Sequence, residues 1–184
     1  MIIFFGYFLV ALSILLSLFY PSFDNFFLPA SHHNYFYWVE YAGNIKLLPV
    51  YLLIFILFGK LKGFQLWRPI SLSILLSSTI LLSKFSNSRK LGNPAEKLSL
   101  PNGSESLFPS GHTGVAIVLA FLIQYTLFQY NRKNKLLLLL PYAIPLFVSI
   151  LLLVNRDHYL TDITASLGLF LIIKNTGPFK APYN

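Results

Sequence analysis

The chain contains no cysteine among its 184 residues, which excludes structural disulfides and zinc sites built on thiolates. Charge is scarce as well, because charged residues make up 11% of the sequence, whereas a soluble domain has about 25%. Only six residues are acidic, against fourteen lysines and arginines. Hydrophobic residues account for 55%, and the mean hydropathy is +0.65. We therefore expect an integral membrane protein.

Long apolar stretches recur along the chain and are candidates for membrane-spanning helices. About 20 apolar residues in a helix cross a bilayer, and shorter stretches suffice where the membrane thins or flanking side chains reach toward water. Such stretches occur at residues 2–20, 46–59, 66–83, 111–129, 136–154 and 159–174. We expect an all-α fold, a bundle of six transmembrane helices that forms a single domain over residues 1–184 of a multi-pass cell-membrane protein.

Charged residues are distributed unevenly between the two sides of such a bundle. One side has basic residues and no acid: Lys60, Lys62, Arg68, Arg132, Lys133, Lys135, Lys174 and Lys180. The other side carries all six acids. Because cytoplasmic loops are rich in lysine and arginine, we expect both termini in the cytoplasm and the segments near residues 110 and 158 on the outer face. The net charge of +8 then reflects topology, and we expect no nucleic-acid partner.

The segment NRDHYLTDITAS contains the first candidate group for catalysis. His158 and Asp162 are four residues apart, which places them on one face of a helix. A carboxylate that accepts from one imidazole nitrogen fixes the tautomer and makes the other nitrogen a better nucleophile. The alternative is a pair that merely satisfies itself at a helix start. Ionisable groups at membrane depth are costly, which favours a functional role.

The segment LFPSGHTG contains the second candidate group. Ser110 is a favourable helix N-cap, and Gly111 allows close approach to the backbone. The N–H groups at a helix start favour an anion, and His112 in the first turn could donate a proton to a leaving oxygen. The alternative is an ordinary capped helix start with an interfacial histidine.

Several cations lie near these segments in the sequence. Arg156 is two residues before His158, and Lys84, Arg89 and Lys90 are expected in the outer loop after the third helix. Guanidinium groups match phosphate oxygens well, although these loop residues could equally be solvated or contact lipid headgroups. An anion-binding helix start, two histidines, an aspartate and cations together predict phosphoryl transfer, with neither a metal nor a cofactor.

At these residues the chain resembles the type 2 phosphatidic acid phosphatase superfamily. Its members share a six-helix membrane core and three motifs, KxxxxxxRP, PSGH and SRxxxxxHxxxD. PSGH is matched in full at residues 109–112, and the HxxxD end of the third motif is matched at residues 158–162. The resemblance covers about half of the chain, from the third to the sixth predicted helix.

The resemblance implies a role for each matched residue. His158 would be the nucleophile that forms a phosphohistidine, and Asp162 would orient it. His112 would protonate the leaving group, while Ser110 and the Gly111 amide would hold the phosphate oxygens.

The other motif positions depart from the family pattern. Leu151 and Leu152 stand where the third motif has Ser-Arg, and Arg156 could substitute from the loop. The segment KLKGFQLWRP has the wrong spacing and lies on the predicted cytoplasmic side, so KFSNSRK, residues 84–90, is the better counterpart of the first motif. RDHYLTD also resembles the sphingomyelin synthase-like branch, whose members transfer phosphorylated headgroups between lipids.

We therefore predict a membrane lipid phosphatase that cleaves a phosphate ester through a phosphohistidine at the outer face. Its partners would be a membrane lipid substrate and the bilayer. Transfer of a headgroup to another lipid is the alternative within the same chemistry. A non-catalytic lipid-binding protein and a transporter are alternatives from other classes, and the oligomeric state is left open.

Overall fold

The structure is a computed structural model that describes residues 2–19, 44–90, 109–130, 134–155 and 157–176. Within these ranges the regular elements are all helical, without a strand. The helices are α1 (Ile2–Phe19), α4 (Leu48–Leu61), α5 (Trp67–Lys90), α6 (Gly111–Tyr130), α7 (Lys135–Leu139), α8 (Ala143–Val154) and α9 (Leu160–Asn175). Two 3-10 turns, η1 (Ile45–Leu47) and η3 (Leu140–Tyr142), precede α4 and α8.

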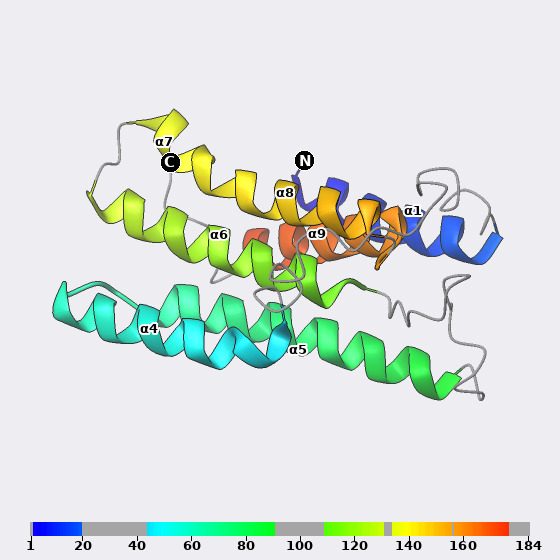
Figure 1. Cartoon of the computed structure of the whole chain (residues 1–184), viewed down its shortest axis with the longest axis horizontal. Helices are drawn as coiled ribbons and strands as arrows, with labels where there is room; N and C mark the ends of the chain where they lie inside the picture. Colours follow the sequence, from blue (N-terminus) through cyan, green and yellow to red (C-terminus); the bar gives the residue numbers. More distant parts are fainter. Residues whose placement is uncertain (1, 20–43, 91–108, 131–133, 156, 177–184) are drawn as a thin grey trace.

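Helix α6 is the central element of the bundle (Figure 1). It contacts α4, α5, α8 and α9, and its first half is almost entirely buried, from Gly111 to Leu122. A helix that is apolar on all sides is expected in the interior. Two hydrophobic clusters meet on α6: one joins it to α4, α5 and α9, and the other joins Ala116 to α8 and α9. The active-site candidates at its start therefore rest on the best packed helix of the described part.

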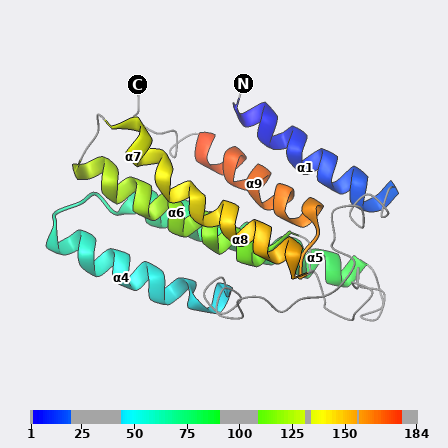
Figure 2. The ribbon, with the colours of Figure 1, turned by 45° about the horizontal axis from the view of Figure 1, so that its top comes forward.

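Helix α9 is held between α6 and α1, and α1 covers its outer side (Figure 2). The backbones of α1 and α9 touch, because a Cβ atom at Gly6 would lie 2.9 Å from the Gly168 carbonyl oxygen. Small residues allow such close helix contacts in membranes. One polar contact joins the same pair, 2.7 Å between the hydroxyls of Ser13 and Thr164. These contacts fix the position of α9, whose start carries Asp162.

Among the described residues, two helical stretches are long and apolar enough to cross a membrane: Gly111–Tyr130, which is α6, and Leu136–Val154, which runs through α7, η3 and α8. Shorter apolar helices occur at Ile2–Leu16, Leu48–Leu61 and Trp67–Ser83. The all-helical fold is thus confirmed for the described part, whereas the six-span bundle and its orientation stay predictions.

Helix α5 differs from expectation at its end. It continues beyond residue 83 to Lys90, so Lys84, Arg89 and Lys90 belong to the helix, and their predicted placement in a loop is wrong. The reason is local, because no glycine or proline occurs between Ser71 and Leu91 to stop the helix. Hydropathy falls at residue 83 without ending the hydrogen-bonded turns.

Candidate active site

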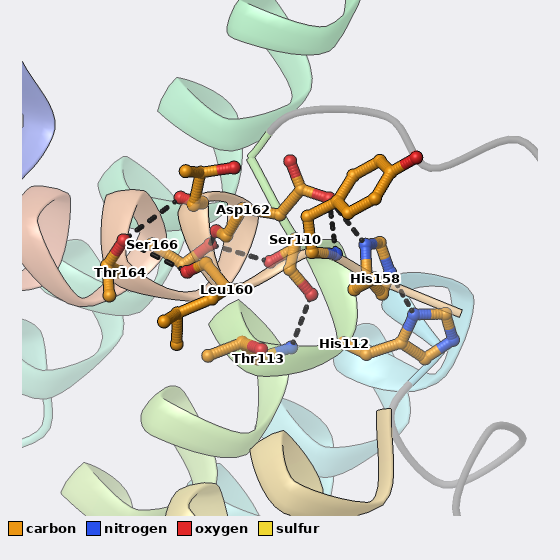
Figure 3. Close-up of polar contacts among 10 residues, drawn as sticks. Ser110, His112, Thr113, His158, Leu160, Asp162, Thr164 and Ser166 are labelled. Atoms are coloured by element: carbon orange, nitrogen blue, oxygen red, sulfur yellow. Dashed lines mark hydrogen bonds and ion pairs between the residues drawn. The ribbon is translucent and has the colours of Figure 1, made fainter. Parts of the chain in front are cut away.

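The starts of α6 and α9 meet, and backbone and side-chain hydrogen bonds join them (Figure 3). The Ser110 amide donates to the Asp162 carbonyl over 3.1 Å. The Ser166 hydroxyl lies 2.9 Å from the Ser110 carbonyl oxygen and 3.0 Å from that of Asp162. All three residues are buried. The two segments that carry the histidines are therefore fixed relative to one another by groups outside the histidines themselves.

The Asp162 side chain serves the start of α9 as well as His158. Its Oδ2 atom accepts from the Tyr159 amide over 3.1 Å, an N-terminal capping contact of the kind that satisfies an otherwise unpaired N–H. The same oxygen lies 3.4 Å from His158 Nδ1. Because Asp162 is 2% exposed, its carboxylate is held in one orientation with His158 as its side-chain neighbour.

His158 lies between Asp162 and His112, in a turn that α8 holds in place. The amides of Asp157 and His158 both point to the Leu152 carbonyl, at 2.9 and 3.4 Å. The His158 side chain is 5% exposed, and its Nε2 atom lies 3.3 Å from Nδ1 of His112. If Nδ1 of His158 donates to Asp162, Nε2 of His158 carries a lone pair. The hydrogen bond between the two rings then needs a proton on Nδ1 of His112.

The arrangement is a row, Asp162, His158, His112, with the half-buried His112 at its open end. The two imidazole rings have centroids 5.5 Å apart and are inclined by 59°. Both links in the row are longer than the usual 2.9–3.0 Å of an N–H···O bond, as is common at catalytic sites without substrate. Among the described residues, no group of three His, Cys, Asp or Glu side chains could hold a metal ion.

Ser110 is the N-cap of α6, as predicted from the sequence. Its hydroxyl oxygen accepts from the Thr113 amide over 3.2 Å, and its side chain is fully buried. The first N–H groups of a helix have no acceptor within the helix and point out of its start, and the Gly111 amide occupies such a position. A helix start of this kind favours an anion.

The predicted cations are only partly placed. Arg156 lies outside the described residues, as do the side chains of Lys84 and Arg89. The α5 backbone does locate Lys84: Ile80 packs on Gly114, where a Cβ atom would come within 2.3 Å of Ile80 Cδ1. Helices α5 and α6 run in opposite directions (Figure 1), so one turn beyond this contact brings Lys84 level with Ser110.

Two buried hydroxyl residues near the site were not foreseen, Thr113 and Ser166. Thr113 Oγ1 has no hydrogen-bond partner among the described residues, and Ser166 bridges the two helix starts. A signal for Ser166 was present, because it follows Asp162 by four residues and so shares its helix face. Its partner Ser110, however, is distant in sequence and only the packing of α6 on α9 reveals it.

The family model of the PAP2 superfamily matches residues 3–174 of the chain, a span that includes both histidine segments. Comparisons with curated proteins and with solved structures give no match.

Proposed function

Because the chain belongs to the PAP2 superfamily, and so is expected to act as a phosphatase or phosphotransferase, we propose that it hydrolyses a phosphate ester of a membrane lipid through a phosphohistidine. One observation carries the proposal: the row of side chains in which the buried His158 has a carboxylate at Nδ1 and a second histidine at Nε2. Such a row provides a nucleophile, an orienting base and a proton donor within contact distance.

In the first step, Nε2 of His158 attacks phosphorus and the bond from phosphorus to the lipid oxygen breaks. The leaving oxygen takes the proton from Nδ1 of His112, and the lipid alcohol departs. Asp162 accepts from Nδ1 of His158 and stabilises the positive charge that develops on this ring. The distance of 3.3 Å between Nδ1 of His112 and Nε2 of His158 leaves no room for a phosphoryl group, so substrate binding must move His112 away.

In the second step, water attacks phosphorus in line with the P–N bond. His112, now neutral, takes a proton from this water, inorganic phosphate leaves, and His158 regains its lone pair. Water and a lipid alcohol can use the same intermediate, so access of water to His158 separates hydrolysis from transfer.

Phosphate binding is assigned to the start of α6 and to nearby cations. The Gly111 amide and Ser110 would contact phosphate oxygens at the helix start, where the partial positive charge favours an anion. Lys84 is the best placed cation because its backbone is level with Ser110 along α5. Arg89 and Arg156 are further candidates.

We place the chain in the cell membrane as a six-span bundle with the site on the outer face. The exposed apolar side chains support burial in a bilayer: Phe4 is 75% exposed and Leu146 is 63% exposed, on helices at different sides of the bundle. Large apolar surfaces of this kind mark contacts with lipid or protein. The basic side, with Lys60 and Lys62, would face the cytoplasm.

Headgroup transfer between lipids is the second candidate. It is favoured by one observation, the replacement of the Ser-Arg pair of the third motif by Leu151 and Leu152, which are buried in the packing of α8. A site with fewer fixed cations suits a phosphodiester better than a phosphomonoester, because the former carries less charge.

The test uses purified protein in detergent with EDTA present. The substrates are phosphatidic acid, diacylglycerol pyrophosphate, and a ceramide with a phospholipid donor, and free phosphate and lipid products are followed together. Phosphate release that the His158→Ala variant abolishes supports the phosphatase. A new headgroup lipid without free phosphate moves the chain to the transferase branch, and equal silence of wild type and variant contradicts both.

A further inference from the structure

An apolar groove lies between α4 and α6. Helix α4 contributes Tyr51, Ile54 and Phe58 to its wall, and α6 contributes Leu119, Ile123 and Leu127. The cavity volume is about 270 Å³. Thr126 also lines it, but its hydroxyl donates to the Leu122 carbonyl within its own helix over 2.9 Å. The lining of the groove is therefore apolar and suits a hydrocarbon ligand.

The groove and His112 are on the same face of α6. Leu119 follows His112 by seven residues and Ile123 follows it by eleven, spacings that complete two and three helical turns. At 1.5 Å per residue, Leu119 lies about 10 Å and Leu127 about 22 Å along the helix from His112. In a hydrocarbon layer about 30 Å thick, the groove would cover the middle third below the site.

The groove is open on the outside of the bundle. Ile54 is 59% exposed and Ile123 is 40% exposed, although both belong to its wall. Helices α4 and α6 run side by side along it (Figure 2). Between His112 and Leu119, Val115 and Ala116 are buried. A ligand held at His112 would therefore reach the groove from the bilayer side and not through the helix packing.

We propose that this groove holds a hydrocarbon tail of the phosphorylated lipid while its phosphate is bound beside His158. The inference rests on the function proposed above. The shared face of α6 fixes the register between headgroup and tail, and exposure of the wall residues admits a chain from the bilayer. The volume is slightly below the range for ligand pockets, about 300–1,000 Å³, which suits one chain and leaves a second chain in the bilayer.

The proposal predicts selectivity for long chains. A tail that reaches past Leu119 gains contact with the groove, whereas a short tail ends above it. Contacts with two additional methylene groups correspond to about a tenfold change in affinity. The enzyme should therefore bind dioleoyl phosphatidic acid more tightly than the dioctanoyl form, beyond the difference expected from partition into the micelle.

The first experiment blocks the groove with Ile123→Trp and measures kcat and KM for both lipids in mixed micelles. Ile150→Trp is the matched control, since Ile150 is 50% exposed on α8 and does not line the groove. We expect KM for the dioleoyl lipid to rise about tenfold in Ile123→Trp only, with the dioctanoyl lipid within twofold of wild type. Equal effects on both lipids, or no effect on either, would overturn the proposal.

The second experiment does not depend on turnover. His158→Ala protein in micelles is irradiated with phosphatidic acid that carries a diazirine at the end of one acyl chain, and crosslinks are mapped by mass spectrometry. We expect crosslinks at Leu119–Leu127 and Tyr51–Phe58 that excess unlabelled phosphatidic acid removes. Crosslinks spread over the outer faces of α1 and α8 would show bulk lipid only and overturn the groove. If crosslinks fill the groove while wild type releases no phosphate, only the proposed reaction fails.

Discussion

At the scale of single residues, the proposed reaction depends on His158 and its two neighbours. The sequence predicted that Ser110 would cap a helix, and this contact is present. It also predicted that His158 and Asp162 would meet on one face of a helix. The two side chains are in contact, but His158 precedes the extended N-cap residue Tyr159 and lies outside α9, so the shared helix face is wrong. It also predicted that the two histidine segments would meet, and Nδ1 of His112 lies 3.3 Å from Nε2 of His158. Asp162 has a second contact, with the Tyr159 amide, which spacing alone did not predict.

Replacing Asp162 by Asn tests its orienting role. The amide oxygen can still accept from the Tyr159 amide, so the helix start is kept, but the negative charge that stabilises the His158 ring is lost. We expect kcat for phosphatidic acid to fall by about 10²–10⁴-fold, with KM within a few fold. Asp157→Asn is the matched control and should keep kcat within about threefold. A fall in thermal stability together with an unchanged kcat would contradict this role.

Replacing His112 by Asn tests its role as the proton donor. The loss of general acid catalysis should reduce kcat for phosphatidic acid by about 10²–10⁴-fold. For a substrate whose leaving group needs no proton, such as p-nitrophenyl phosphate, the rate of phosphohistidine formation should fall far less. Burst kinetics compare the two substrates. Equal losses in the burst rate for both would assign His112 to binding and not to proton transfer.

At the scale of helices, the site is the junction of α6 and α9. The apolar stretches predicted these two helices, because the apolar character of a segment can be read from its own residues. They did not predict the end of α5, since helix propensity continues where hydropathy falls. Nor did they predict the contact of α1 with α9 through Gly6 and Gly168, which depends on the pairing of distant helices.

Replacing Ser166 by Ala tests the junction. The change removes a buried hydroxyl that bridges Ser110 and Asp162, a loss of about 1 kcal/mol of stability. We expect a lower unfolding temperature in detergent and a several-fold lower kcat, because His112 and His158 lose part of their fixed spacing. Ser78→Ala on α5 serves as control and should change neither. Full activity together with a lower unfolding temperature would mean that Ser166 contributes only to stability and does not position the two histidines.

At the scale of the whole molecule, charge and hydropathy predict an orientation in the membrane. The basic turn between α4 and α5 would face the cytoplasm, and the segment with Asp157 would face outward. The sequence alone yields this predicted orientation, because the uneven distribution of charge can be read along the entire chain. The groove between α4 and α6 could not be predicted, since it arises from the packing of two helices.

The absence of cysteine makes this orientation simple to test. Single cysteines are introduced as Lys62→Cys and Asp157→Cys, and intact cells are treated with a membrane-impermeant maleimide. We expect Asp157→Cys to react in intact cells and Lys62→Cys to react only after the membrane is opened. The reverse pattern would place the site on the cytoplasmic side.

The central claim is that His158 carries the phosphoryl group during turnover. The most direct measurement mixes the enzyme with radiolabelled phosphatidic acid, quenches with denaturant within the first turnover, and locates protein-bound phosphate by mass spectrometry. We predict a phosphoryl group on His158 that is labile in acid and stable in base, present in wild type and absent in His158→Ala. Release of free phosphate at full rate without any phosphoryl group on the protein would mean direct attack by water and would contradict the account.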